Sequence, residues 1–224
     1  MSAQLTSLTI TVDETQRVSG LLLSPSKARA CYVLAHGAGA GMQHAFMTAI
    51  AEGLAERSIA TLRYQFPYME QGKGRPDSPA LAQATVRAAV GAAAGRMAMV
   101  SLVAGGKSFG GRMTSQAQAS DPLPGVRGLA FLGFPLHTGG KPSDSRAKHL
   151  SQVRVPMLFL QGTRDALAEL SLIQGVVKQL GPRATLHAVD DADHSFHVRA
   201  KSGRKDAQAL KELCDVLSDW MLSV

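Results

Sequence analysis

The most informative part of the sequence is MVSLVAGGKSFGGRM, residues 99–113. Its first part, Met99–Ala104, is a short apolar run that predicts a buried strand. The turn that follows has the form G-x-S-x-G over residues 106–110, and residues 111–119 have helical spacing. A strand, a tight turn and a helix in this order raise Ser108 above the end of a sheet, at the positive end of the helix. Glycines two residues before and two after the serine leave room for so tight a turn.

Short apolar runs alternate with helix-like segments along the rest of the chain. The expected strands are residues 5–12, 18–23, 31–35, 59–63, 99–104, 129–133, 156–161 and 185–189. The expected helices are residues 46–57, 80–94, 111–119, 168–180 and 205–222, and residues 65–79 are expected to form a loop. This alternation indicates an α/β fold, a mostly parallel sheet of about seven to eight strands with helices on both faces. No helix separates the first two strands, so that edge should be antiparallel, and residues 1–224 should form a single domain.

A serine hydroxyl is a poor nucleophile unless a base takes its proton, and the base in turn needs an orienting acid. In a fold of this kind the acid and then the histidine follow the serine in the chain, each just after a strand. Asp165 follows the strand at residues 156–161, and His194 follows the last strand. Ser108, Asp165 and His194 are therefore the predicted catalytic triad. His197, three residues after His194, is the competing base.

A second glycine-rich segment, HGAGAG at residues 36–41, follows the expected strand at residues 31–35. Acyl transfer creates an oxyanion, which requires preorganised N–H donors. The predicted donors are the backbone N–H groups of Ala38 and Phe109. A phosphate-binding P-loop would end in Gly-Lys-Ser/Thr, whereas this segment continues with Met42, so that interpretation is excluded.

The loops after the strands carry the residues expected to surround a substrate. The predicted substrate-binding residues are His36, Gly37, Phe66, Tyr68, Lys107 and Phe134. Packing beneath the loops is the alternative role for the aromatic members. Residues 134–155 leave space only for a short helix between two strands, so we expect no large cap domain and an open site. Arg112 is expected to form a salt bridge with an acid near Ser108, the alternative being recognition of a substrate carboxylate or phosphate.

Three motifs resemble those of the α/β-hydrolase superfamily: HGAGAGMQHAFM (36–47), LRYQFPYME (62–70) and GGKSFGGRM (105–113). The resemblance covers essentially the whole chain. Within the superfamily, the chain most resembles the small, lid-poor dienelactone-hydrolase-like branch. Within that branch, it resembles bacterial relatives of the testis-expressed and NSL-complex hydrolase-like proteins. It implies the α/β-hydrolase fold and the same triad. Dienelactone hydrolases use a cysteine nucleophile where this chain has Ser108, so dienelactone is not the expected substrate.

These residues predict a serine hydrolase that cleaves a small ester or thioester through an acyl-enzyme on Ser108. We expect no cofactor and no metal ion. Two alternatives use the same fold: an acyltransferase with the same triad, and an interaction module without catalytic activity.

The chain has a formal net charge of +7. Three loop segments on the predicted catalytic edge, residues 63–79, 134–154 and 195–206, hold eleven Lys and Arg against four Asp and Glu, which accounts for the whole surplus. Basic residues never occur in runs of more than two and aromatic residues are only 5%, which argues against nucleic-acid binding. A basic rim would instead attract an anionic ester, with plain solvation of these charges as the alternative.

Two cysteines, Cys31 and Cys214, lie in apolar stretches and predict buried, reduced thiols. The N-terminal residues lack the basic start and apolar segment of a signal peptide. The longest apolar region, residues 88–104, is interrupted by Arg96 and is too short to span a bilayer. We therefore expect a cytoplasmic protein that binds no membrane; the sequence leaves its oligomeric state open.

Overall fold

The computed structural model describes residues 3–224, through which one eight-stranded sheet runs in the order β1-β2-β4-β3-β5-β6-β7-β8. The strands are β1 (Ala3–Thr11), β2 (Arg17–Pro25), β3 (Ala30–Ala35), β4 (Ile59–Tyr64), β5 (Ser101–Lys107), β6 (Val126–Leu132), β7 (Met157–Gly162) and β8 (Ala184–Val189). β2 pairs antiparallel with both β1 and β4, and every other pair is parallel. The mostly parallel sheet with an antiparallel edge is therefore confirmed.

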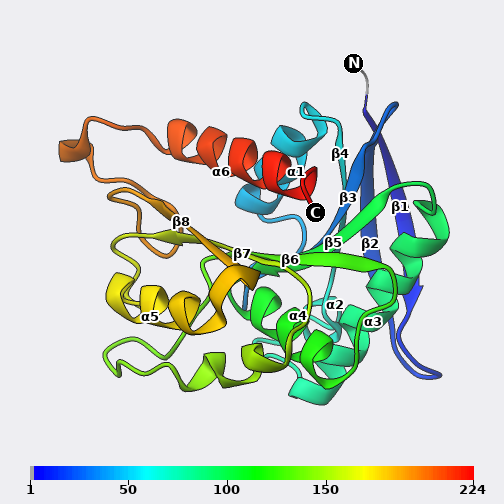
Figure 1. Ribbon diagram of the computed structural model, residues 1–224. Coiled ribbons are helices and arrows are strands. Elements are labelled where there is room, and N and C mark those ends of the chain that lie inside the picture. The colour runs from blue at the N-terminus through cyan, green and yellow to red at the C-terminus, as the bar shows by residue number, and fades with distance from the viewer. Residues whose placement is uncertain (1–2) are drawn as a thin grey trace.

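Helices cover both faces of the sheet (Figure 1). On one face lie α1 (Ala45–Ala55) and α6 (Asp206–Met221), and on the other lie α3 (Pro79–Arg96), α4 (Phe109–Ser120) and α5 (Leu170–Leu180). The shorter helices are α2 (Pro67–Glu70) and the 3-10 turns η1 (Ser145–Gln152), η2 (Gly181–Arg183) and η3 (Ala200–Ser202). The connection from β6 to β7 holds only η1, so no large cap domain covers the sheet. Within residues 3–224, no helix combines the length and apolarity needed to cross a membrane.

The continuous apolar strands arise because each central strand is buried on both sides. All six residues of β3, and all six of β7, are buried. Phe131 and Phe159 belong to the core beneath α3, α4 and α5, whereas Leu34 and Leu132 belong to the core beneath α1 and α6. Both cysteines are buried and unpaired, as predicted.

Most element boundaries shift by a few residues, and two differences from the sequence prediction have a clear physical cause. The run beginning at Met99 was expected to be a strand, but β5 starts at Ser101, and Met99 is 95% exposed in the turn that follows α3. The segment at residues 65–79 was expected to be a loop, but it contains α2. That helix begins with Pro67, whose fixed φ suits a first helical position.

Candidate active site

Ser108 stands between β5 and α4 with φ 50° and ψ −114°. A positive φ is costly for a residue with a side chain and persists only when the surrounding structure enforces it. A Cβ atom on Gly106 would overlap the carbonyl oxygen of Ala35, and one on Gly110 would lie 2.5 Å from the carbonyl oxygen of His36. The two glycines thus let the turn approach β3 closely, which raises the serine above the sheet.

Ser108, His194 and Asp165 form one hydrogen-bonded chain. His194 Nε2 lies 2.9 Å from Ser108 Oγ, and His194 Nδ1 lies 2.6 Å from Asp165 Oδ2. The Asp165 side chain is fully buried, whereas that of His194 is 23% exposed. The structure therefore brings together the three residues that the sequence singled out.

Asp165 is held by groups that the sequence analysis missed. Gln161 Nε2 donates to Asp165 Oδ2, and the backbone N–H of Leu167 donates to Asp165 Oδ1 at 2.8 Å. Gln161 Oε1 in turn accepts a hydrogen bond from the backbone N–H of Phe134 at 2.9 Å. These bonds fix the plane of the carboxylate that faces the imidazole. A lone amide inside the apolar run of β7 was the available signal, because a buried polar side chain needs partners.

His197, the competing base, faces away from Ser108. Its Nδ1 lies 2.8 Å from Asp206 Oδ2, and this hydrogen bond raises the pKa of His197. Asp193 Oδ1 accepts from the backbone N–H groups of Ser195 and His197, which shapes the turn after β8. Of the two candidate bases, His194 is the one that reaches Ser108 Oγ.

The backbone N–H groups of Ala38 and Phe109 have no hydrogen-bond acceptor within residues 3–224. The neighbouring Gly39 N–H, by contrast, donates to Tyr68 Oη at 3.0 Å, which anchors the loop. Ala38 is exposed and lines the same pocket as Ser108. Two backbone N–H groups without an acceptor therefore belong to neighbours of Ser108: Phe109 follows it in the chain, and Ala38 lines the same pocket.

A pocket of about 390 Å³ opens beside Ser108. Its lining is Gly37, Ala38, Ala40, His44, Phe46, Met47, Lys107, Ser108, Leu167, His194 and Ser195. Of the predicted substrate-binding residues, Gly37 and Lys107 belong to this lining.

The other four predicted substrate-binding residues do not line the pocket. His36, Phe66, Tyr68 and Phe134 are each at most 1% exposed. Phe66 packs edge-on against both His36 and Phe109, while Phe134 packs against two core phenylalanines of β6 and β7. The prediction that they surround the substrate is wrong, because the loops fold back and bury them.

His36 ties two loops together as a neutral imidazole. Its Nε2 accepts from the backbone N–H of Phe66 at 3.1 Å, so its Nδ1 carries the proton and donates to the carbonyl of Gly37 at 2.7 Å. Burial lowers the pKa of His36 to about 4. The imidazole thereby links the loop after β3 to the loop after β4.

Lys107 holds the segment that carries His194. Its Nζ donates to the carbonyl oxygen of His194 at 2.6 Å and lies 5.6 Å from the centre of the Phe196 ring. Burial lowers the pKa of Lys107 to about 8, against the opposing effect of the Asp165 and Asp193 charges. The residue before the serine thus braces the backbone of the histidine.

Arg112 lacks the acidic partner that was expected. Within residues 3–224 no carboxylate lies within ion-pair distance of it, and its buried Nε has no hydrogen-bond acceptor. Its guanidinium lies 5.9 Å from the centre of the Phe109 ring, and burial together with the charge of Arg146 lowers its pKa. The salt-bridge prediction is therefore wrong.

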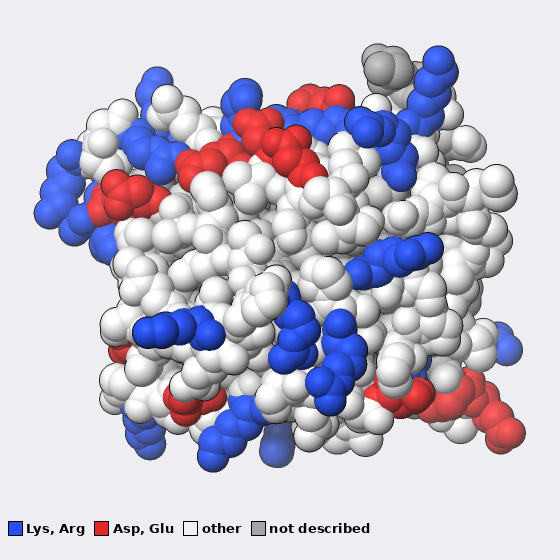
Figure 2. Space-filling model, in the orientation of Figure 1, with Lys and Arg blue, Asp and Glu red and all other residues white. Residues whose placement is uncertain are grey.

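The basic rim is less extensive than the sequence count suggested. Arg63 is only 4% exposed and donates to Thr48 Oγ1 at 2.7 Å beneath α1, so it does not belong to the rim. Arg199 pairs with Asp191. Figure 2 still shows Lys and Arg side chains gathered at the left edge, over the segment that leads into α6.

A family model described as an alpha/beta hydrolase domain matches residues 28–222, so the chain belongs to the α/β-hydrolase family. Its structure is similar to dienelactone hydrolase from Anabaena variabilis ATCC 29413, with a TM-score of 0.81 and 20% identity over 99% of this chain and 98% of that one. It is also similar to an α/β serine hydrolase without a lid from Xanthomonas campestris, with a TM-score of 0.75 and 20% identity over 98% and 96%. The esterase domain of a Rhodothermus marinus protein gives a TM-score of 0.74 and 16% identity over 98% of each chain. At these sequence identities, the similarity to these three structures shows a shared fold.

Proposed function

We propose that this protein is a serine hydrolase of the carboxylesterase type, which cleaves a small ester or thioester through an acyl-enzyme on Ser108. The observation that carries the proposal is the hydrogen-bonded chain from buried Asp165 through His194 to Ser108 Oγ, with contacts of 2.6 and 2.9 Å. This arrangement supports the proposal, because acyl transfer by a serine needs a nucleophile, a base and an orienting acid in hydrogen-bond contact.

In the acylation step, His194 Nε2 takes the hydroxyl proton while Ser108 Oγ attacks the substrate carbonyl carbon. The carbonyl π electrons move to its oxygen, and the resulting oxyanion accepts from the free N–H groups of Ala38 and Phe109. The bond to the leaving oxygen or sulfur then breaks, and His194 gives that atom its proton. The Asp165 carboxylate stabilises the transient imidazolium.

Deacylation repeats these steps with water. His194 Nε2 takes a proton from water, the resulting hydroxide attacks the acyl carbon, and the proton returns to Ser108 Oγ as the acid leaves. Asp165 keeps the imidazole oriented in both half-reactions because Gln161 and Leu167 hold its carboxylate.

The size of the pocket favours a small acyl group. The space beside Ser108 is about 390 Å³, and the aromatic side chains that would have lined a deeper cavity are packed in the core. The family's esterase and hydrolase relatives are consistent with ester chemistry.

Ser108→Ala tests the proposal with p-nitrophenyl acetate and butyrate as substrates. We expect kcat to fall by at least about 10⁴-fold, because the nucleophile is lost. The matched control Ser151→Ala, at an exposed position on η1, should retain full activity. A fluorophosphonate probe should label the wild type and the control but not Ser108→Ala. A folded wild-type protein that neither labels nor turns over esters would instead favour the interaction module, and acyl transfer to added alcohols in preference to water would favour the acyltransferase.

A further inference from the structure

A second hollow of about 440 Å³ lies next to the pocket beside Ser108, between α1 and the start of α6. Phe46 and Ser195 line both hollows, so the two are neighbours that share a wall. The floor and sides of the second hollow are mainly apolar, including Ala49, Phe196 and Leu210. We call this second hollow the α1–α6 groove.

Two stacked phenylalanine rings line the groove. The rings of Phe46, on α1, and Phe196, two residues after His194, are 5.8 Å apart and inclined by 6°. Phe196 is 3% exposed and its ring is also approached by Lys107, so its position is fixed. The half-buried ring of Phe46 thus gives the groove an apolar wall that continues into the pocket beside Ser108.

The mechanism determines which half of the substrate lies on this side. His194 Nε2 must place a proton on the leaving oxygen or sulfur, so that atom lies next to the imidazole, with the rest of the leaving group beyond it. Ser195 and Phe196 directly follow His194, and both line the groove. The acyl part is attached to the opposite side of the carbonyl carbon and points away from the groove.

We propose that the α1–α6 groove binds the alcohol or thiol part of the substrate and that this part is an apolar chain or ring. The inference rests on the proposed function, since it assigns the leaving-group side of the same site. Apolar leaving groups are selected because each buried methylene leaves water for an apolar wall.

Two ester series separate the two halves of the substrate. In one, acetates of ethanol, butanol, hexanol and octanol vary the alcohol; in the other, ethyl esters of acetic to octanoic acid vary the acyl group. Proton release measures the turnover of both series. In the wild type, kcat/KM should rise about threefold per methylene along the alcohol series until the groove is full.

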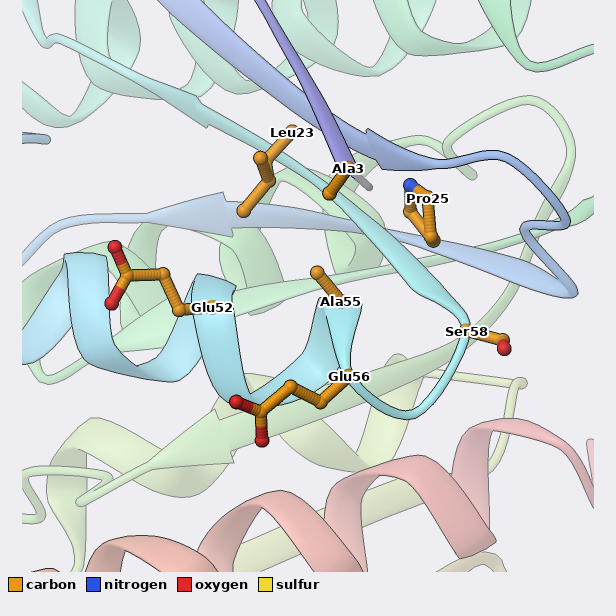
Figure 3. Close-up of a pocket in the computed structure, with 7 residues that line it drawn as sticks. All are labelled: Ala3, Leu23, Pro25, Glu52, Ala55, Glu56 and Ser58. Carbon is orange, nitrogen blue, oxygen red and sulfur yellow. The ribbon is translucent and has the colours of Figure 1, made fainter. Parts of the chain in front are cut away.

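Ala49→Phe fills the groove from α1, where Ala49 is partly buried. It should lower the kcat/KM ratio of hexyl to ethyl acetate by at least about tenfold, because several methylenes lose their apolar contact. The matched control is Ala55→Phe on the same helix, also partly buried. Ala55 faces a separate pocket of about 310 Å³ near Leu23 and Pro25, at the other end of α1 (Figure 3), where a phenyl ring has room. This control should keep the wild-type ratio.

A lowered hexyl-to-ethyl ratio in Ala49→Phe alone supports the inference. If the wild type hydrolyses esters but the ratio is equal in wild type and Ala49→Phe, or if Ala49→Phe changes only the acyl series, the groove does not hold the leaving group and the inference is overturned. A folded wild type without ester turnover and without fluorophosphonate labelling would overturn the proposed function as well, so the two failures are distinguishable.

Discussion

Ser108 stands at a positive φ because the glycines around it allow two backbone segments to approach more closely than side chains would permit. Ser108 has the strained backbone conformation, whereas Gly106 and Gly110 are the residues that lie against the backbone of Ala35 and His36. In this arrangement the hydroxyl oxygen lies at the end of the sheet, 2.9 Å from His194 Nε2.

Gly110→Ala should therefore damage both the fold and the site. Its new Cβ would lie 2.5 Å from the carbonyl oxygen of His36, a backbone atom that cannot move aside, and we expect a loss of about 3 kcal/mol of unfolding free energy. Fluorophosphonate labelling of the folded fraction should also slow. Gly91→Ala in α3 is the control, because no atom lies within 4 Å of a Cβ there and alanine favours a helix by up to about 1 kcal/mol. Equal urea midpoints for the two variants would contradict this explanation.

Lys107 is a positioning residue for His194 in our proposal. Lys107→Met removes the donor to the His194 carbonyl, and we expect kcat to fall about tenfold with little change in KM. The ammonium of the wild type loses its proton as the pH rises through its pKa of about 8, which weakens a charge-assisted bond. Wild-type kcat should consequently decline above about pH 8, and this decline should be absent from Lys107→Met. A pH–rate profile for both proteins measures this, and parallel profiles would exclude the role.

At the scale of elements, the order of strands assembles the site. β5, β6, β7 and β8 are consecutive parallel neighbours, so their carboxyl ends share one edge of the sheet. Ser108 follows β5, Asp165 follows β7 and His194 follows β8. Residues distant in the sequence therefore meet without any long loop having to fold across the molecule.

The loops after β3 and β4 are joined by His36, which makes their junction sensitive to acid. The pKa of His36 is about 4 in the folded protein because of burial, against 6.5 for the free side chain. Between these two pH values the unfolded chain binds a proton at His36 that the folded chain does not bind. The free energy of unfolding is therefore highest above about pH 6.5 and falls as the pH approaches 4. The whole pKa difference corresponds to a loss of about 3 kcal/mol of unfolding free energy.

His36→Gln should remove this part of the acid sensitivity, because the amide does not titrate. Urea unfolding at pH 7 and at pH 4.5 measures the difference for both proteins. His149, whose pKa burial also lowers to about 4, leaves a residual dependence in the variant. An unchanged loss of stability between the two pH values would show that His36 does not cause it.

At the scale of the whole molecule, the surplus charge is concentrated in loops while the interior of the sheet is apolar. Arg63 is buried, and Arg199 and Arg204 are paired with acids, so the rim consists of the remaining exposed Lys and Arg. Such a rim raises the local concentration of anions near an open site.

Hydrolysis of an anionic ester should therefore depend more strongly on salt than hydrolysis of a neutral one. We expect kcat/KM for monoethyl succinate to fall about threefold between about 20 and about 200 mM NaCl, since screening shortens the reach of the rim. Ethyl butyrate, which is similar in size and uncharged, should change far less. Equal salt dependence of the two substrates would mean that the rim is only solvated.

Local sequence patterns were enough to predict the sheet and the places of Ser108, Asp165 and His194 after their strands. A continuous apolar run identifies a buried strand, and a glycine-bracketed serine or a polar residue directly after such a run identifies its carboxyl end. Local patterns do not predict every element: a short helix begins at Pro67, although the segment around it has the composition of a loop.

The surroundings of Ser108 could not be predicted in this way, because they depend on how distant segments fold together. Phe66 and Phe134 follow strands as Ser108 does, yet they are buried. Phe46 and Leu167, from other segments, line the pocket instead. The hydrogen-bond partners of Gln161 and Lys107 could not be predicted from the sequence either. The physical reason is that strand ends are set by neighbouring residues, whereas burial and hydrogen-bond partners depend on which distant segments pack together.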